Sequence, residues 1–95
     1  MSTDITVTRN DERARFEAIV DGDVAGFSEF RLSEGRIEFT HTLVDDAYEG
    51  QGVGSTLVGE ALDRVRAEGL DVVATCPFVR SYIERHQEYA DLLAS

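Results

Sequence analysis

The chain has 95 residues, enough for one hydrophobic core and too few for a second, so we predict a single domain over residues 1–95. Nineteen acidic residues against nine basic ones, all arginine, give a net charge of −10, which argues against nucleic acid or an anionic membrane as partner and favours cationic partners. No apolar run approaches the roughly twenty residues that span a bilayer, no secretory leader is recognisable and one cysteine cannot form an internal disulfide, so we expect a cytoplasmic protein.

The first half of the chain has the alternating apolar pattern of half-buried strands. The dipeptides Asp21-Gly22 and Glu34-Gly35 predict tight turns within it. The simplest arrangement is four successive antiparallel strands, over about Ile5–Arg9, Phe16–Val20, Val24–Leu32 and Arg36–Val44. In the last of these strands one apolar face is predicted to carry Ile37, Phe39, His41 and Leu43.

After Gly54 the apolar pattern takes the period of a helix. Apolar side chains recur three and four residues apart as far as Val65, and Gly69 suits a left-handed cap, so we predict a helix of about four turns. Residues 71–76 then form a short strand, which a strand-helix-strand crossover places parallel to the fourth strand. Beyond Pro77, helical spacing predicts one face with Val79, Tyr82, Ile83 and His86.

The most informative segment is the loop before this helix, which carries Gly50, Gly52 and Gly54. The unpaired N–H groups of a first helical turn bind anions together with the helix dipole, and glycines let a phosphate approach the backbone. The run lacks the spacing of a dinucleotide fingerprint and the lysine of a P-loop. It therefore predicts a main-chain site for a pyrophosphate, the alternative being glycines that only shape a tight turn.

The pattern Glu49-x-x-Gly52-x-Gly54 followed by a helix resembles motif A of the GCN5-related N-acetyltransferases, which binds the pyrophosphate of acetyl-CoA. Glu49 departs from the Gln or Arg usual at the first position of that motif. Over about residues 36–93 the chain resembles the short, single-domain YjdJ-like branch of the superfamily, although Gln87 replaces a proline expected there. The segments that carry this resemblance are His41-Thr42, Cys76-Pro77-Phe78-Val79, Tyr82, Arg85-His86 and Glu88-Tyr89.

This resemblance implies an α/β fold with a mixed sheet of about five strands packed between helices. The sheet would be antiparallel except for a splayed parallel pair formed by the fourth and fifth strands. The resemblance also implies acetyl-CoA as co-substrate, and the scattered histidines and cysteine offer no metal-ligand spacing. The predicted cofactor-binding residues are Leu43, Val44, Gln51, Gly52, Val53, Gly54, Ser55 and Thr56.

Three side chains are candidates for the chemistry, each with a structural alternative. Cys76 is either a nucleophile that briefly carries the acetyl group or a small residue that lines the site. His41 either accepts its proton or belongs to the core, and we expect both residues to face the same opening between adjacent strands. Tyr82 resembles the tyrosine that protonates the departing thiolate in this superfamily, or it is an aromatic packed on the sheet.

The predicted function is transfer of an acetyl group from acetyl-CoA to a primary amine. The acidic surface favours a small cationic amine or a basic protein segment as acceptor, bound in an open groove. The rival functions are a non-catalytic acyl-CoA-binding or interaction module and a purely structural domain. We expect a monomer or weak homo-oligomer, and the acidic excess without lysine predicts adaptation to high salt.

Overall fold

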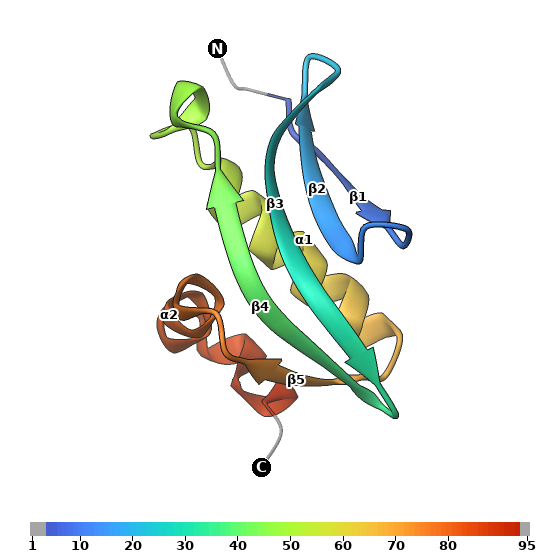
Figure 1. Cartoon of the computed structure of the whole chain (residues 1–95). Coiled ribbons are helices and arrows are strands. Elements are labelled where there is room, and N and C mark those ends of the chain that lie inside the picture. Colours follow the sequence, from blue (N-terminus) through green and yellow to red (C-terminus); the bar gives the residue numbers. More distant parts are fainter. Residues whose placement is uncertain (1–3, 94–95) are drawn as a thin grey trace.

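The computed structural model describes residues 4–93 as a five-stranded sheet with α1 on one face and α2 beside β4 and β5 (Figure 1). The strand order is β1-β2-β3-β4-β5, antiparallel except for the parallel β4–β5 pair, which confirms the predicted mixed sheet. The strands are β1 (Thr6–Asn10), β2 (Arg15–Val20), β3 (Asp23–Ser33), β4 (Arg36–Val44) and β5 (Asp71–Ala74). The helical segments are η1 (Asp46–Tyr48), α1 (Val53–Ala67), α2 (Pro77–Arg85) and η2 (Gln87–Leu92).

The core lies between α1 and the sheet face that carries three phenylalanines whose rings are tilted against one another. The ring of Phe16 is 5.3 Å from that of Phe30 and 6.1 Å from that of Phe39. The apolar stripe of α1 is buried, and its fully covered members include Leu57, Val58, Leu62 and Val65. Burying a side chain of this size contributes about 1.5–3 kcal/mol, so the helix is held mainly by this stripe.

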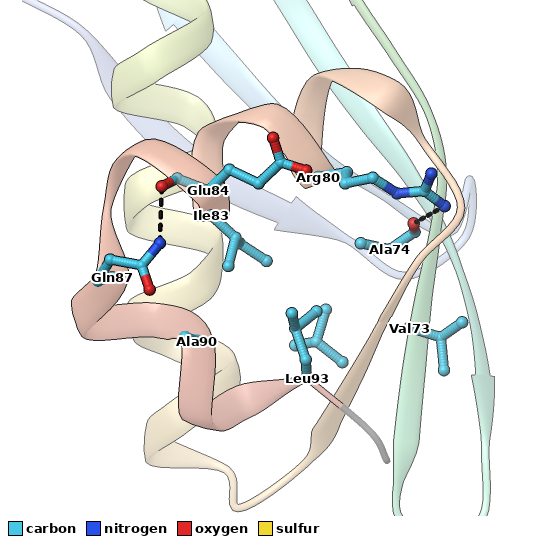
Figure 2. A pocket seen from close by; sticks show the side chains of 9 residues that line it. Val73, Ala74, Arg80, Ile83, Glu84, Gln87, Ala90 and Leu93 are labelled. Atoms are coloured by element: carbon cyan, nitrogen blue, oxygen red, sulfur yellow. Dashed lines mark hydrogen bonds between the residues drawn. The ribbon is translucent and has the colours of Figure 1, made fainter.

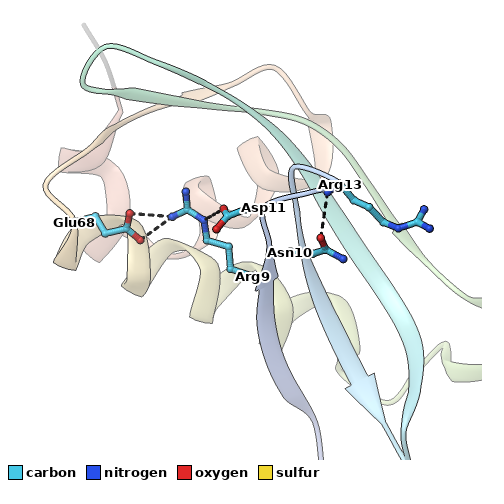
Figure 3. A network of polar contacts seen from close by, with 5 residues as sticks. All are labelled: Arg9, Asn10, Asp11, Arg13 and Glu68. Atoms are coloured by element: carbon cyan, nitrogen blue, oxygen red, sulfur yellow. Dashed lines mark hydrogen bonds and ion pairs between the residues drawn. The ribbon is translucent and has the colours of Figure 1, made fainter.

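An ion-pair cluster joins the C-terminal end of α1 to β1. One guanidinium nitrogen of Arg9 donates to both carboxylate oxygens of Glu68 at 2.9 Å, and its Nε donates to Asp11 at 2.7 Å (Figure 3). These partners outweigh the effect of burial and raise the pKa of Arg9. Gly69, which follows Glu68 at the end of α1, has a φ of 70°. This value confirms the left-handed cap predicted after the helix.

A β-bulge at Thr40 changes the faces of β4. His41 lies opposite Glu29, but Phe39 lies opposite Phe30, so Thr40 is an extra residue in this strand. Beyond it, Thr42 faces the α1 side, where its hydroxyl is 2.9 Å from that of the fully buried Ser28. The prediction that His41 and Leu43 share the face of Phe39 is therefore wrong, because the bulge turns them to the opposite face.

Beyond Phe39 the strands β4 and β5 separate. Their pairing runs from Arg36 and Asp71 to Phe39 and Ala74, and the Cys76 N–H then donates to the Phe39 carbonyl at 2.9 Å. The fifth strand thus ends two residues before the predicted end at Cys76, while β4 continues to Val44 (Figure 1). This separation leaves one edge of the second half of β4 without a neighbouring strand.

Salt should stabilise this fold. In residues 4–93, ion pairs with carboxylates engage Arg9, Arg15 and Arg66, while most carboxylates have no cationic partner. Raising KCl from dilute buffer to 1 M shortens the screening length to about 3 Å and weakens repulsion among the unpaired carboxylates. We expect the midpoint of thermal unfolding to rise, measured by circular dichroism; a flat or falling midpoint would contradict the predicted adaptation to high salt.

Candidate active site

The loop between β4 and α1 presents unpaired main-chain donors. Gly50 and Gly52 have φ values of 80° and 77°, in the left-handed region that favours glycine. Gly52 caps α1 with no side-chain hydrogen bond, and the first N–H bonded back along the helix is that of Thr56, which donates to the Gly52 carbonyl at 3.0 Å. The N–H groups of Val53, Gly54 and Ser55 are thus left for a ligand, as the first turn of a helix leaves them.

These donors border a cavity of about 260 Å³ whose lining includes Val44, Gly52, Val53, Gly54 and Ser55. Two residues predicted to bind the cofactor are placed differently. The Gln51 N–H donates to the Tyr48 carbonyl at 3.4 Å, and Thr56 lines a neighbouring groove. The sequence predicts an anion site over residues 51–56, and in the structure the backbone N–H groups available to an anion are those of residues 53–55.

Side chains at this cavity supply no positive charge. Its polar side chains are those of Tyr48, Glu49 and Ser55, and Phe78 of α2 closes it from above Gly54. A Cβ atom at Gly54 would lie 2.6 Å from the Phe78 ring, so a larger residue there would require that ring to move. An anion bound here would depend on main-chain N–H groups and on the dipole of α1, and the main-chain anion site stays a prediction.

The free edge of β4 adds a second group of donors beside this cavity. The Asp45 N–H donates to the Ala25 carbonyl at 2.8 Å, and bonded residues alternate along an antiparallel ladder. Leu43 and His41 therefore direct their backbone groups toward β3, whereas Val44 and Thr42 direct theirs toward the space between β4 and β5. Of the two strand residues predicted to bind the cofactor, Val44 has the suitable orientation and lines the cavity, and Leu43 has neither property.

Cys76 is buried and hydrogen-bonded within the sheet. Its thiol donates to the Thr42 hydroxyl at 3.3 Å, and that hydroxyl is bonded in turn to Ser28. His41 projects from the opposite face of β4, where its ring is 6.1 Å from that of Phe27. The structure thus pairs Cys76 with Thr42 and does not bring it together with His41. Thr42 was missed as a partner because the sequence pattern did not reveal the bulge at Thr40.

Tyr82 lies on α2 against Gly59 of α1. Its ring stacks on that of His86 at 4.1 Å, and burial together with the charges of Glu88 and Asp63 raises the pKa of Tyr82. The tyrosine lines a groove of about 350 Å³ that shares Ser55 with the loop cavity. Phe78, one turn earlier on α2, is the aromatic residue that lines the loop cavity itself.

The contact between Gly59 and Tyr82 predicts a non-additive pair of substitutions. A Cβ atom at position 59 would lie 2.7 Å from the Tyr82 hydroxyl oxygen. Gly59→Ala should therefore lower stability in the natural chain, whereas in a Tyr82→Phe background it should gain up to about 1 kcal/mol from helix propensity. Denaturant unfolding of the four proteins measures the coupling, and additive effects would show that the hydroxyl does not occupy this position.

A larger cavity, of about 460 Å³, lies between β5 and the C-terminal helices (Figure 2). Its apolar lining comes from Val72, Val73, Ala74, Ile83 and Leu93. At its rim Arg80 donates to the Ala74 carbonyl at 3.3 Å, and Gln87 donates to the Glu84 carbonyl at 2.7 Å (Figure 2). No part of the glycine loop borders it, so it is separate from the site described above.

Residues 4–93 contain no group of three or more His, Cys, Asp or Glu side chains that could hold a metal ion. Within the same residues, no helix has the length and apolar character needed to cross a membrane.

The strand, glycine loop and helix that form this site also match a known family. The profile of the GCN5-related N-acetyltransferases matches residues 15–92, which is most of the chain. The chain belongs to the GCN5-related N-acetyltransferase family. Protein NATD1 of Gallus gallus is 36% identical over 50 residues, covering 53% of this chain and 46% of that protein. Protein NATD1 of Xenopus tropicalis is 28% identical over 87 residues, covering 90% of this chain and 80% of that protein.

A solved structure supports the fold of this family member. The solution structure of a GCN5-like protein from Staphylococcus aureus superposes with a TM-score of 0.73 at 24% identity, covering 100% of this chain and 92% of that one. The match to the chicken protein spans a little under half of that protein's length. The profile match shows the family, and the superposition shows the fold.

Proposed function

We propose that this N-acetyltransferase family member transfers the acetyl group of acetyl-CoA to a primary amine. The observation that carries the proposal is the juxtaposition of three unpaired N–H groups at the start of α1 with the free edge of β4. The N–H groups of Val53, Gly54 and Ser55 would bind the pyrophosphate. The N–H of Val44 would donate to the thioester oxygen, on which negative charge develops as the amine attacks.

His41 and Tyr82 are the proposed acid–base residues. His41 is exposed on the sheet face away from α1, where an amine can reach it, and would accept the proton of the attacking ammonium. Tyr82 would give a proton to the departing thiolate; its phenol is protonated at neutral pH, and burial raises its pKa further. Its groove adjoins the loop cavity at Ser55.

Cys76 should prove to be a buried packing residue and not a nucleophile. Its thiol is buried and donates to a hydroxyl, and its neighbours Thr42 and Ser28 provide no base. We expect Cys76→Ser to keep the hydrogen bond, normal acetyl-CoA affinity and most of the turnover. Mass spectrometry of the natural protein with acetyl-CoA and no acceptor should show no acetyl group on Cys76; a stoichiometric adduct there would establish the covalent route instead.

Turnover separates this function from its rivals. Calorimetry measures acetyl-CoA binding, and release of the CoA thiol in the presence of a panel of primary amines measures transfer. Binding with amine-dependent release supports the proposal. Tight binding without release from any amine would favour a non-catalytic acyl-CoA-binding module, and absence of binding would favour a structural domain.

A further inference from the structure

We propose that the sheet face formed by Phe27, Glu29, His41 and Leu43, called here the acceptor face, binds the amine, and that the acceptor is a short aliphatic diamine. This inference rests on the proposed acetyl transfer and specifies its substrate class. The four residues form two cross-strand pairs, Phe27 with Leu43 and Glu29 with His41. Two such pairs extend about 7 Å along the strands, which suits a small molecule.

The bulge at Thr40 places this face opposite the cofactor groups. Side chains of Thr42 and Val44 point toward α1 and the glycine loop, while those of His41 and Leu43 point away from them. The proposed position of acetyl-CoA occupies the α1 side of the space between β4 and β5. An amine that attacks the thioester must then approach from the other side of the sheet, across the acceptor face.

The floor of the acceptor face is apolar and held in place. Leu43 is 47% exposed beside its partner Phe27. The guanidinium of Arg15 lies 4.4 Å from the centre of the Phe27 ring and is itself paired with Glu17 at 2.8 Å. This stack fixes the aromatic ring from the β2 side and leaves Leu43 and the ring edge for the methylene groups of a ligand.

Glu29 is a carboxylate on this face that is available to a cation. Glu17 is paired with Arg15, and Glu38 accepts a hydrogen bond from the Thr75 hydroxyl. The Glu29 carboxylate, half-buried, makes no hydrogen bond or ion pair with the rest of residues 4–93. Its direct cross-strand neighbours are Arg15 on β2, whose guanidinium is paired with Glu17 and lies over the Phe27 ring, and His41 on β4. An anionic group and a proton acceptor thus lie side by side.

The reaction decides which nitrogen Glu29 contacts. The attacking nitrogen must lose a proton, and a carboxylate held against it would stabilise the ammonium and oppose the reaction. Glu29 therefore benefits the reaction most by binding a second ammonium on the same molecule. The apolar floor between the two ammonium positions accommodates the connecting methylene groups.

Acetyl transfer to the amine begins with a proton transfer. His41 takes one proton from the ammonium, and the nitrogen lone pair forms a C–N bond to the thioester carbon. The C–S bond breaks, and the CoA thiolate leaves with its electron pair and takes a proton from Tyr82, which the second proton of the nitrogen later replaces. The new amide nitrogen loses a second proton, so one ammonium and acetyl-CoA give an N-acetyl amine, the CoA thiol and one proton.

Two measurements on the full chain test the proposal. The first compares kcat/KM for 1,4-diaminobutane and butylamine, which share a carbon chain and differ in the second amine. We expect a preference for the diamine of about tenfold or more, as a charge-assisted contact provides. Glu29→Gln should bring the ratio close to one without changing acetyl-CoA affinity in calorimetry. Glu34→Gln, at an exposed turn, removes the same charge elsewhere and should keep the ratio.

The second measurement is independent of turnover. Titration with 1,4-diaminobutane should shift NMR signals of Phe27, Glu29, His41 and Leu43 in the natural chain and not in Glu29→Gln. Turnover with equal rates for both amines and no such shifts would overturn the acceptor face while leaving acetyl transfer intact. Shifts at these residues without turnover of either amine would support the acceptor face and count against the proposed activity.

Discussion

Replacing Gly52 by valine should weaken acetyl-CoA binding by about 1 to 3 kcal/mol, or about fivefold to 150-fold in affinity. Gly52 holds a φ of 77° at the cap of α1, a conformation that a β-branched residue adopts only with strain. A valine there would shift the first turn of the helix, and the N–H groups of Val53, Gly54 and Ser55 would no longer converge on one anion. Calorimetry with acetyl-CoA measures the loss.

Gly22→Val is the matched control for this substitution. Gly22 has a φ of 82° in the turn between β2 and β3, and a Cβ atom there, as at Gly52, meets nothing within 4 Å. Both variants therefore introduce similar backbone strain, and both should lose stability in thermal unfolding. Only Gly52→Val should lose acetyl-CoA affinity. Equal affinity for the two variants would mean that the start of α1 does not bind the cofactor.

The local features of this fold were predictable because each depends on neighbouring residues alone. Asp21 and Gly22 both have positive φ, as the Asp-Gly turn signal predicted for a hairpin. The helical period of apolar residues after Gly54 predicts α1, and the β-branched residues after Gly69 predict β5. The strand-helix-strand order predicts that β5 is parallel to β4, as the structure has it. The main-chain anion site that the loop glycines indicate stays a prediction, and the left-handed φ of Gly52 at the start of α1 is consistent with it.

The faces of β4 were not predictable in the same way. A bulge depends on how two strands pair, and the sequence of β4 by itself alternates without interruption from Ile37 to Leu43. One extra residue, Thr40, therefore reversed the predicted orientation of every later side chain in the strand. The same shift separated His41 from Cys76, gave Cys76 its contact with Thr42 and placed His41 beside Glu29.

Because His41 and Cys76 lie apart in the structure, we expect the substitution of His41 to have the largest effect on catalysis. A general base contributes typically 10²–10⁴-fold, so His41→Ala should lower kcat by about a hundredfold or more. Acetyl-CoA affinity should stay unchanged in calorimetry, because His41 projects from the face opposite the glycine loop. Free imidazole, which can take the place of the missing side chain, should restore part of the rate.

His86→Ala removes the other imidazole of the chain and provides the comparison. His86 stacks on Tyr82 and lies on the helical side of the molecule, away from the acceptor face. Any loss of rate in that variant would act through the packing of Tyr82, so free imidazole should not restore it. Undiminished turnover in His41→Ala, or rescue of both variants alike, would remove His41 from the proton transfer. The amine would then have to reach the thioester already neutral, with backbone donors of β4 as the main source of catalysis.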